Sequence, residues 1–286
     1  MSEKRDGRIW IEGMDNVFTG QTIADLRLHE RLPVTEPVRI LPDVWVVKIG
    51  GQSIMDRGRA AVFPVIDELV AAKRAGTQFV LCAGGGTRAR HCYALGLDLG
   101  MPTGVLAKVG ASVPVQNARM LQMLTAKHGG VMVYHDDLEK LPLYLGTQCI
   151  PIMSGMPPFE FWEKTPSVGR LPLHRTDAGT FLLGEFLGAE GILYIKDEDG
   201  LYTADPKKDS EARFIPRADA KDLLDSGQDD FIIERVVLEY MQRTRHIREI
   251  RIVNGLKQGQ VTAALRGESV GTVIQSPPLR EPSPVG

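Results

Sequence analysis

Val44-Trp45-Val46-Val47-Lys48-Ile49-Gly50-Gly51 is an apolar run that ends in a lysine and two glycines. A strand without a polar face is buried on both sides, as in a parallel sheet that helices cover. Six more short β-branched runs are predicted strands, at residues 79–83, 131–134, 150–153, 192–196, 250–254 and 272–274. Helical stretches such as residues 59–74 lie between them. The alternation predicts an α/β fold with a doubly wound, mostly parallel sheet and helices on both faces.

The composition is that of a globular protein. Of the 286 residues, 43% are hydrophobic and 24% are charged, values close to the average for globular chains. The formal net charge of -2 provides no overall field to attract nucleic acid or anionic lipid. Three cysteines without CxxC spacing argue against a disulfide framework or a structural zinc site. No run approaches the ~18 apolar residues of a spanning helix, and no signal-like segment opens the chain, so we expect a cytoplasmic protein.

The chain divides into three parts. Residues 1–43 lack steady periodicity and contain several prolines, so we expect an N-terminal arm before the domain. Residues 44–275 form the predicted domain. Residues 276–286 carry four prolines and are expected to be a disordered tail. Within the domain, residues 154–175 and 197–217 depart from the βα rhythm, and loops of this length are usually functional or mobile.

Two glycine-rich turns follow the first two strands of the domain. Gly50 and Gly51 follow Lys48 directly, and glycines at this edge let backbone N–H groups approach an anion. The alternative is a strand that turns tightly while Lys48 points to solvent. The second turn, Gly84-Gly85-Gly86, leads into a predicted helix whose N-terminus favours anions. It matches neither the GxGxxG fingerprint nor the P-loop.

Basic residues in the first turns of this second helix oppose the helix dipole, so helix stability does not account for them. They are Arg88, Arg90 and His91. An oxyanion partner would explain them, and so would salt bridges to acidic residues of another subunit.

Asp177 opens an apolar helix, and taken alone it fits an N-cap residue. Lys196 ends a later strand and precedes a charged run that, taken alone, fits a solvated loop. However, Lys48, the Gly84 turn and Lys196 all fall at carboxyl ends of predicted parallel strands. Open α/β sheets bind ligands at that edge, so these separate features predict a single site.

The ordered motifs KIGGQS (48–53), AGGGTRARH (83–91), RTDAGTFLL (175–183), KDEDGLYTADP (196–206) and NGL (254–256) with ALRGESVGTVI (264–274) resemble those of the amino-acid kinase family, over residues 44–275. That family includes aspartokinases and uridylate kinases. The resemblance implies that Lys48, Gly50 and Gly51 hold the phosphates of ATP and that Asp177 orients active-site lysines. It implies contacts to phosphate and adenine for Lys196, Asp199, Gly200, Tyr202, Asp205 and Pro206.

Within that family, GGQSIMDRGRAAV (50–62), GTRARH (86–91), SGMPPF (154–159) and KDEDGLYTA (196–204) are similar to motifs of the molybdenum storage proteins, more to their beta than their alpha subunits. This likeness implies ATP with Mg²⁺, molybdate or tungstate as cargo in oxometalate clusters, and a hetero-hexameric cage built with a homologous alpha-type subunit. In uridylate kinases the second turn reads approximately GGGNxxRG and the acceptor segment TGNPFFTTD. The differences here argue against phosphoryl transfer to UMP.

Candidate contacts to an oxometalate are the arginines and histidines whose side chains bind oxoanions, namely Arg88, Arg90, His91, His128 and His135. Each histidine also fits an ordinary surface or core position, and His128 fits a helix end. Glu198 or Asp199 is a candidate for Mg²⁺.

Three functions remain open. The chain is an ATP-binding storage subunit with ATPase-like hydrolysis, a small-molecule kinase acting on a UMP-like or amino-acid acceptor, or a nucleotide-binding structural subunit without catalysis. The sequence leaves open whether molybdenum or tungsten is the cargo and whether this subunit hydrolyses ATP.

Overall fold

The computed structural model describes residues 2–5, 8–11, 37–228 and 231–277, which fall into two compact units, Met1–Val38 and Arg39–Gly286. In the first unit, β1 (Ser2–Arg5) and β2 (Arg8–Ile11) pair antiparallel. Most of the expected arm, and the expected tail beyond residue 277, lie outside the described residues.

The last residues of the expected arm, 39–43, are hydrogen bonded to the end of α6 (Thr176–Leu187). The N–H groups of Ile40 and Leu41 both donate to the carbonyl oxygen of Leu187, at 2.9 and 2.8 Å. Arg39 Nε donates to the carbonyl oxygen of Gly188 at 2.8 Å. These residues, expected to belong to the arm, are therefore part of the larger unit.

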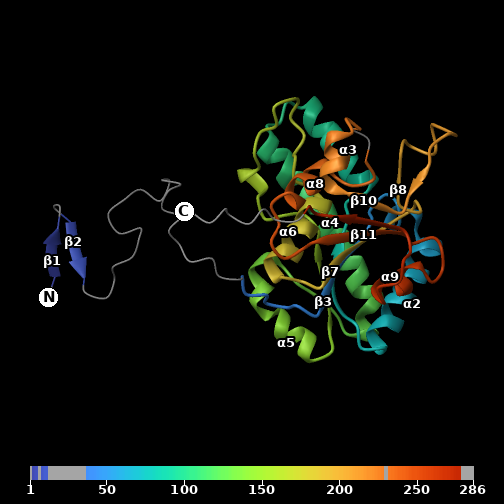
Figure 1. Cartoon of the computed structure of the whole chain (residues 1–286), viewed down its shortest axis with the longest axis horizontal. Helices are drawn as coiled ribbons and strands as arrows, with labels where there is room; N and C mark the ends of the chain where they lie inside the picture. Colours follow the sequence, from blue (N-terminus) through green and yellow to red (C-terminus); the bar gives the residue numbers. More distant parts are fainter. Residues whose placement is uncertain (1, 6–7, 12–36, 229–230, 278–286) are drawn as a thin grey trace, which may run out of the picture. The chain divides into compact units, whose positions relative to one another are not determined.

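An eight-stranded sheet forms the centre of the larger unit (Figure 1). Its order is β10 (Arg217–Asp219), β12 (Thr272–Gln275), β11 (Glu249–Asn254), β7 (Gly191–Lys196), β3 (Val44–Ile49), β4 (Gln78–Ala83), β6 (Ile150–Ser154) and β5 (Gly130–Met132). All neighbours are parallel except β11 and β12. The predicted mostly parallel α/β sheet is confirmed, and the added strand, β10, lies at the end of the stretch expected to be a loop.

Helices cover both faces of the sheet because the central strands are apolar on both sides. On β3, Val44 and Val46 pack in one core cluster while Val47 and Ile49 pack in the other. The first cluster includes residues from α5 (Leu141–Gly146), α6, α7 (Ala220–Asp225) and α8 (Arg235–Met241). The second includes residues from α2 (Arg59–Arg74), α4 (Thr103–Thr125) and α9 (Gln260–Leu265). The doubly wound arrangement follows from this two-sided burial.

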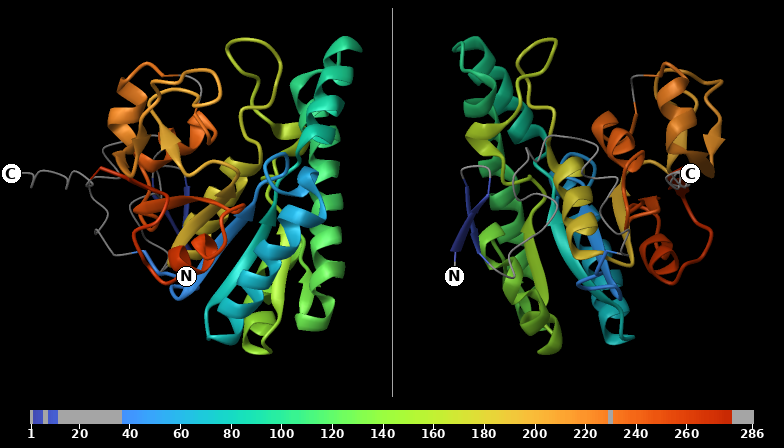
Figure 2. Two further views of the ribbon diagram at one scale, coloured as in Figure 1. Left: turned by 90° about the vertical axis from the view of Figure 1, so that its right-hand side faces the viewer. Right: turned by 60° about the vertical axis from the view of Figure 1, so that its left-hand side comes forward.

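Four loops leave the carboxyl ends of β3, β4, β6 and β7, and parallel pairing brings these ends to one edge of the sheet. The loop after β4 leads into α3 (Thr87–Asp98), which packs against α4. The loop after β6 contains η4 (Glu160–Trp162), and the loop after β7 contains the short antiparallel pair β8 (Leu201–Tyr202) and β9 (Phe214–Ile215). In Figure 2 these loops rise above the same edge of the sheet. Among the described residues, no helix is long and apolar enough to span a bilayer.

Candidate functional site

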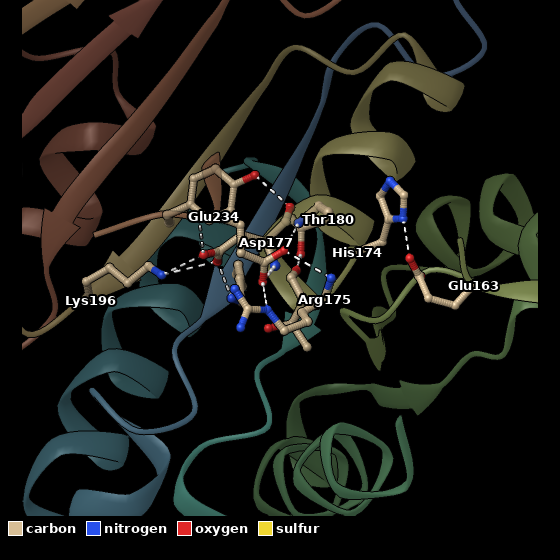
Figure 3. Close-up of polar contacts among 11 residues, drawn as sticks. Glu163, His174, Arg175, Asp177, Thr180, Lys196 and Glu234 are labelled. Carbon is tan, nitrogen blue, oxygen red and sulfur yellow. Dashed lines mark hydrogen bonds and ion pairs between the residues drawn. The ribbon is translucent and has the colours of Figure 1, made fainter. Parts of the chain in front are cut away.

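Two lysines and one aspartate form a buried charged cluster at this edge of the sheet; Figure 3 labels Lys196 and Asp177. Lys48 is the penultimate residue of β3, and Lys196 is the last residue of the neighbouring β7. Lys48 Nζ donates to Asp177 Oδ1, while Lys196 Nζ lies 3.1 Å from Oδ1 and 3.0 Å from Oδ2 of the same carboxylate. The side chains are only 5%, 11% and 6% exposed in the order Lys48, Lys196, Asp177.

The alternation of side chains along the strands explains why both lysines reach one carboxylate. Lys48 projects to the same face of β3 as Val46, and Lys196 to the same face of β7 as Tyr194. Val46 and Tyr194 both pack in the core cluster that α6 covers. Asp177 is the second residue of α6, and Arg175 occupies its N-cap position. The simple interpretation of Asp177 as an N-cap residue is therefore wrong.

The cluster keeps an ionised carboxylate between two cations. Burial raises the pKa of Asp177, but the charges of Lys196 and Lys48 outweigh burial and hold that pKa below its usual range. Burial lowers the pKa of Lys196, and the charge of Asp177 opposes this effect. Two lysines against one aspartate leave local positive charge that attracts an anion.

Glu234 caps the N-terminus of α6 from outside the helix (Figure 3). Its carboxylate accepts hydrogen bonds from the backbone N–H groups of Arg175, Asp177 and Ala178, at 3.0, 3.0 and 3.1 Å. Burial and the charge of Asp177 raise the pKa of Glu234. The sequence gives no sign of Glu234, because a carboxylate that caps a helix from 57 residues away leaves no local pattern.

The two glycine turns touch backbone to backbone. A Cβ atom added to Gly51 would lie 2.7 Å from Gly85 C and 2.7 Å from Gly86 Cα, and one added to Gly84 would lie 2.5 Å from Gly51 N. Atoms this close would collide, so only glycine permits the approach. Within the described chain, the N–H groups of Gly51, Gly85 and Gly86 donate to no acceptor. Free N–H groups in successive turns form a concave site for an anion.

Two side chains that the sequence analysis did not select hold the second turn in place. Asn117, a fully buried residue of α4, donates from Nδ2 to the carbonyl oxygens of Gly84 and Gly85 at 2.5 and 3.1 Å. Asp56 Oδ2 accepts from the N–H of Thr87 at 2.5 Å, at the start of α3. The local sequence does not distinguish Asn117, because Gln116 and Arg119 beside it are also polar.

The charged cluster and the glycine turns border one cavity of about 460 Å³. Most of the residues selected from the sequence line it: Lys48, Gly50, Gly51, Gly85, Gly86, Arg90, Asp177, Lys196, Glu198, Gly200, Tyr202, Asp205 and Pro206. The edge of the parallel sheet thus brings together groups that are distant in the sequence.

Several selected residues do not line the cavity. Gly84 lies behind the turn, where its N–H donates to Ile49 O at 2.9 Å. Arg88 binds the side-chain oxygens of Gln116 and Asn117 on α4, and His91 is exposed on α3.

Asp199 also lies outside the cavity lining. It accepts hydrogen bonds from Asn254 Nδ2 at 2.9 Å and from Lys257 Nζ at 2.6 Å. These two contacts lower the pKa of Asp199. Asp199 therefore anchors the loop after β7 to the end of β11.

The two remaining histidines occupy opposite edges of the sheet. His128 lies in η2 (Ala126–His128), just before β5 begins, and hence at the amino edge, away from the cavity. His135 follows β5 at the carboxyl edge, where its Nε2 lies 2.9 Å from the carbonyl oxygen of Met156. Because Met156 lines the cavity, His135 supports the cavity wall from behind.

The acidic residues that follow β7 are engaged in ion pairs. Glu198 Oε1 lies 2.5 Å from Lys207 Nζ, and Asp197 Oδ2 lies 2.6 Å from Arg57 Nη2. Both carboxylates line the cavity. The described part of the chain contains no group of three or more His, Cys, Asp or Glu side chains that could hold a metal ion.

A parallel sheet with two lysines, a buried carboxylate and paired glycine turns at its carboxyl edge is the arrangement that the family resemblance led us to expect. The amino acid kinase family model matches residues 43–254, and the chain belongs to this family.

Among its relatives, the chain is 45% identical over 261 residues to molybdenum storage protein subunit beta of Azotobacter vinelandii, which covers 91% of this chain and 96% of that protein. It is 25% identical over 238 residues to the uridylate kinase of Methanobrevibacter smithii, covering 81% of this chain and 98% of that enzyme.

Solved structures share the fold. The uridylate kinase of Archaeoglobus fulgidus matches with a TM-score of 0.63 and 24% identity over 80% of this chain and 99% of that one. The UMP kinase of Bacillus anthracis matches with a TM-score of 0.64 and 18% identity over 82% of this chain and 97% of that one. At these identities the likeness establishes the fold alone.

Proposed function

We propose that this chain is the ATP-binding subunit of a complex that stores molybdate or tungstate as oxometalate clusters and loads them in an ATP-dependent way. The storage role is supported by the 45% identity to a molybdenum storage protein subunit over 91% of the chain. The ATP role is supported by the amino acid kinase family membership.

The observation that carries the ATP role is the Lys48–Asp177–Lys196 cluster beside the free N–H groups of the glycine turns. Lysine ammonium groups and backbone N–H groups are the donors that phosphate oxygens require. The cavity of about 460 Å³ lies within the usual range for small-molecule sites. Phosphoryl chemistry needs mainly positioning and charge stabilisation from a protein, and this cluster can supply both.

The residues present also suit Mg²⁺, which prefers one or two carboxylates together with phosphate oxygens. Glu198 and Asp197 line the cavity on the side of Lys196. Glu198 is the candidate ligand, and Lys207, its present partner, would then pair with Asp197. Bound Mg²⁺ would offset phosphate charge, while Lys48 and Lys196 hold the phosphate oxygens.

Assembly with an alpha-type partner is part of the proposal, because the relative is a subunit beta. We infer that the oxometalate lies toward Arg90, the one selected arginine that lines the cavity. The hexameric cage, the roles of His91, His128 and His135 in it, and the cytoplasmic location stay predictions.

The test is to purify the native particle, together with the subunits that accompany it, from cells grown in molybdate or in tungstate. Elemental analysis and particle mass should reveal many metal atoms per chain, and loading of emptied particles should require MgATP. A particle that stays free of both metals would refute the storage role. Absence of MgATP binding by calorimetry would refute the ATP role.

A second candidate is a small-molecule kinase, which the uridylate kinase relatives and the complete lysine cluster favour. In that case ADP formation should depend on UMP, aspartate or another acceptor. The third candidate, a nucleotide-binding subunit without catalysis, predicts that ATP turnover of the complete assembly survives both Lys48→Ala and Asp177→Ala.

A further inference from the structure

Glu234 is a carboxylate in the cavity wall that the proposed ATP site does not itself require. It immediately precedes α8, and its side chain is 9% exposed. Among the described residues, Glu234 forms an ion pair only with Arg175, whose Nε lies 3.8 Å from Glu234 Oε1. Its closest partners are instead three backbone N–H groups of the α6 N-terminus.

These hydrogen bonds are divided between the two carboxylate oxygens. Oε2 accepts from the N–H groups of Arg175 and Ala178, and Oε1 accepts from the N–H of Asp177. Unpaired N–H groups and the positive dipole end favour a carboxylate at a helix N-terminus. Since the bonded groups include Asp177 and its neighbour, Glu234 fixes the backbone from which the Asp177 side chain projects.

Glu234 also contacts the side chain of Asp177. The backbone N–H of Glu234 donates to Asp177 Oδ2 at 3.2 Å, the oxygen that Lys196 Nζ contacts at 3.0 Å. Asp177 is therefore bound to Glu234 through both its main chain and its carboxylate. This reciprocal pair leaves the carboxylate little freedom to rotate away from the lysines.

The segment that carries Glu234 contributes to the cavity as well. Phe231, Ile232 and Ile233 line it, and Glu234 follows them directly. A ligand that contacts this segment is consequently linked, through one residue, to the charged cluster.

We propose that Glu234 is a positioning residue that holds the Asp177 carboxylate between Lys48 and Lys196 and couples this cluster to residues 231–233. The inference rests on the proposed ATP site, because the cluster is the part of that site on which Glu234 acts. Glu234 acts through Asp177 and is not assigned a contact with the nucleotide.

The test uses Glu234→Gln and Glu234→Asp in the complete assembly. The amide oxygen of glutamine can accept two of the three N–H bonds, but its NH₂ group then faces the third N–H. We expect Glu234→Gln to lower kcat for ATP turnover about 10- to 100-fold, because a displaced Asp177 weakens charge stabilisation in the transition state. KM for ATP should change less than about threefold, since the glycine turns remain intact. Glu234→Asp retains the carboxylate and should recover part of kcat.

The matched control is Glu185→Gln, at the other end of α6. Glu185 also accepts hydrogen bonds from three backbone N–H groups, those of the loop residues Arg245, His246 and Ile247, and it does not line the cavity. Loss of a charged hydrogen-bond acceptor should lower thermal stability in both glutamine variants, whereas only Glu234→Gln should lower kcat. An equal loss of kcat in both variants, or an unchanged kcat in folded Glu234→Gln, would overturn the proposal.

A crystal structure of Glu234→Gln separates this inference from the proposed function. If wild-type protein does not bind MgATP, the ATP role fails, and the position of Asp177 in the variant still decides the role of Glu234. An Asp177 carboxylate that leaves one of the lysines supports the proposal. One that keeps both contacts contradicts it.

Discussion

Asp177→Asn is the substitution that tests the charged cluster most directly, because it preserves shape and removes one charge. Lys48 and Lys196 both contact the Asp177 carboxylate, and all three side chains are almost buried. With asparagine, two buried ammonium groups face one amide oxygen, and Glu234 is the remaining buried carboxylate whose charge acts on both of them. The variant should be less stable than the wild type. It should also gain more stability than the wild type when an anion binds at the cluster.

Two routes give the size of the loss. Removing one partner of a buried ion pair typically costs about 3–5 kcal/mol. Alternatively, one lysine loses its proton in the folded state. At pH 7, about 3.4 units below an unfolded lysine pKa of about 10.4, this costs about 1.36 kcal/mol per unit, or about 4.6 kcal/mol. The two routes agree, so we expect a loss of about 3–5 kcal/mol at pH 7.

The loss should depend on pH with a definite sign. A lysine whose folded pKa is lowered binds fewer protons in the folded than in the unfolded state, so stability rises with pH up to the unfolded pKa. The folded pKa of Lys196 is already lowered by burial, with Asp177 opposing, and removal of Asp177 lowers it further. The difference between variant and wild type should therefore shrink by up to about 1.4 kcal/mol per pH unit between pH 7 and pH 10.

The assay is urea unfolding of both proteins at pH 7, 8.5 and 10, repeated with MgATP. A triphosphate supplies the missing negative charge, so MgATP should stabilise the variant more than the wild type. A difference below about 1 kcal/mol at pH 7, or one that is constant with pH, would refute the buried-charge reasoning.

Three further substitutions test the rest of the site. Gly51→Ala forces a methyl group into the backbone of the second glycine turn. It should lower the free energy of unfolding by about 1–3 kcal/mol and weaken MgATP binding in calorimetry. The control is Gly146→Ala, where an added Cβ has nothing within 4 Å; it should be neutral or stabilising. Asn117→Ala leaves the buried carbonyl oxygen of Gly84 without its side-chain donor and should cost about 1–3 kcal/mol in urea unfolding; an unchanged midpoint would contradict that role. Lys48→Ala should lower ATP turnover of the complete assembly about 100- to 1,000-fold, and a turnover equal to wild type would place hydrolysis outside this cluster.

The sheet could be predicted from the sequence because two-sided burial imposes its own pattern. A central strand such as Val44–Ile49 is buried on both faces, so it appears in the sequence as a continuous apolar run. The glycines that follow it indicate a close approach of two backbone segments. β10 escaped prediction because three residues with exposed or half-buried side chains give no periodic signal.

The site could be predicted only to the level of the edge on which it lies. Arg88, Arg90 and His91 are close in sequence, but a helix turns about 100° per residue, so where α4 packs decides which of them reaches the cavity. Arg90 lines it, while Arg88 turns to α4. Similarly, His128 and His135 are seven positions apart and fall at opposite ends of β5.

From the sequence alone came the parallel α/β fold, the glycine turns and the lysines at the strand ends, because local burial and backbone geometry restrict which residues those positions accept. Only the tertiary structure revealed Glu234 and Asn117, and it placed Asp177, which the local sequence presented as an N-cap and the family resemblance as a partner of lysines, between two cations. These contacts join residues far apart in the chain, and their energies depend on distance and burial in space. Neither quantity is encoded in the spacing of residues along a single segment.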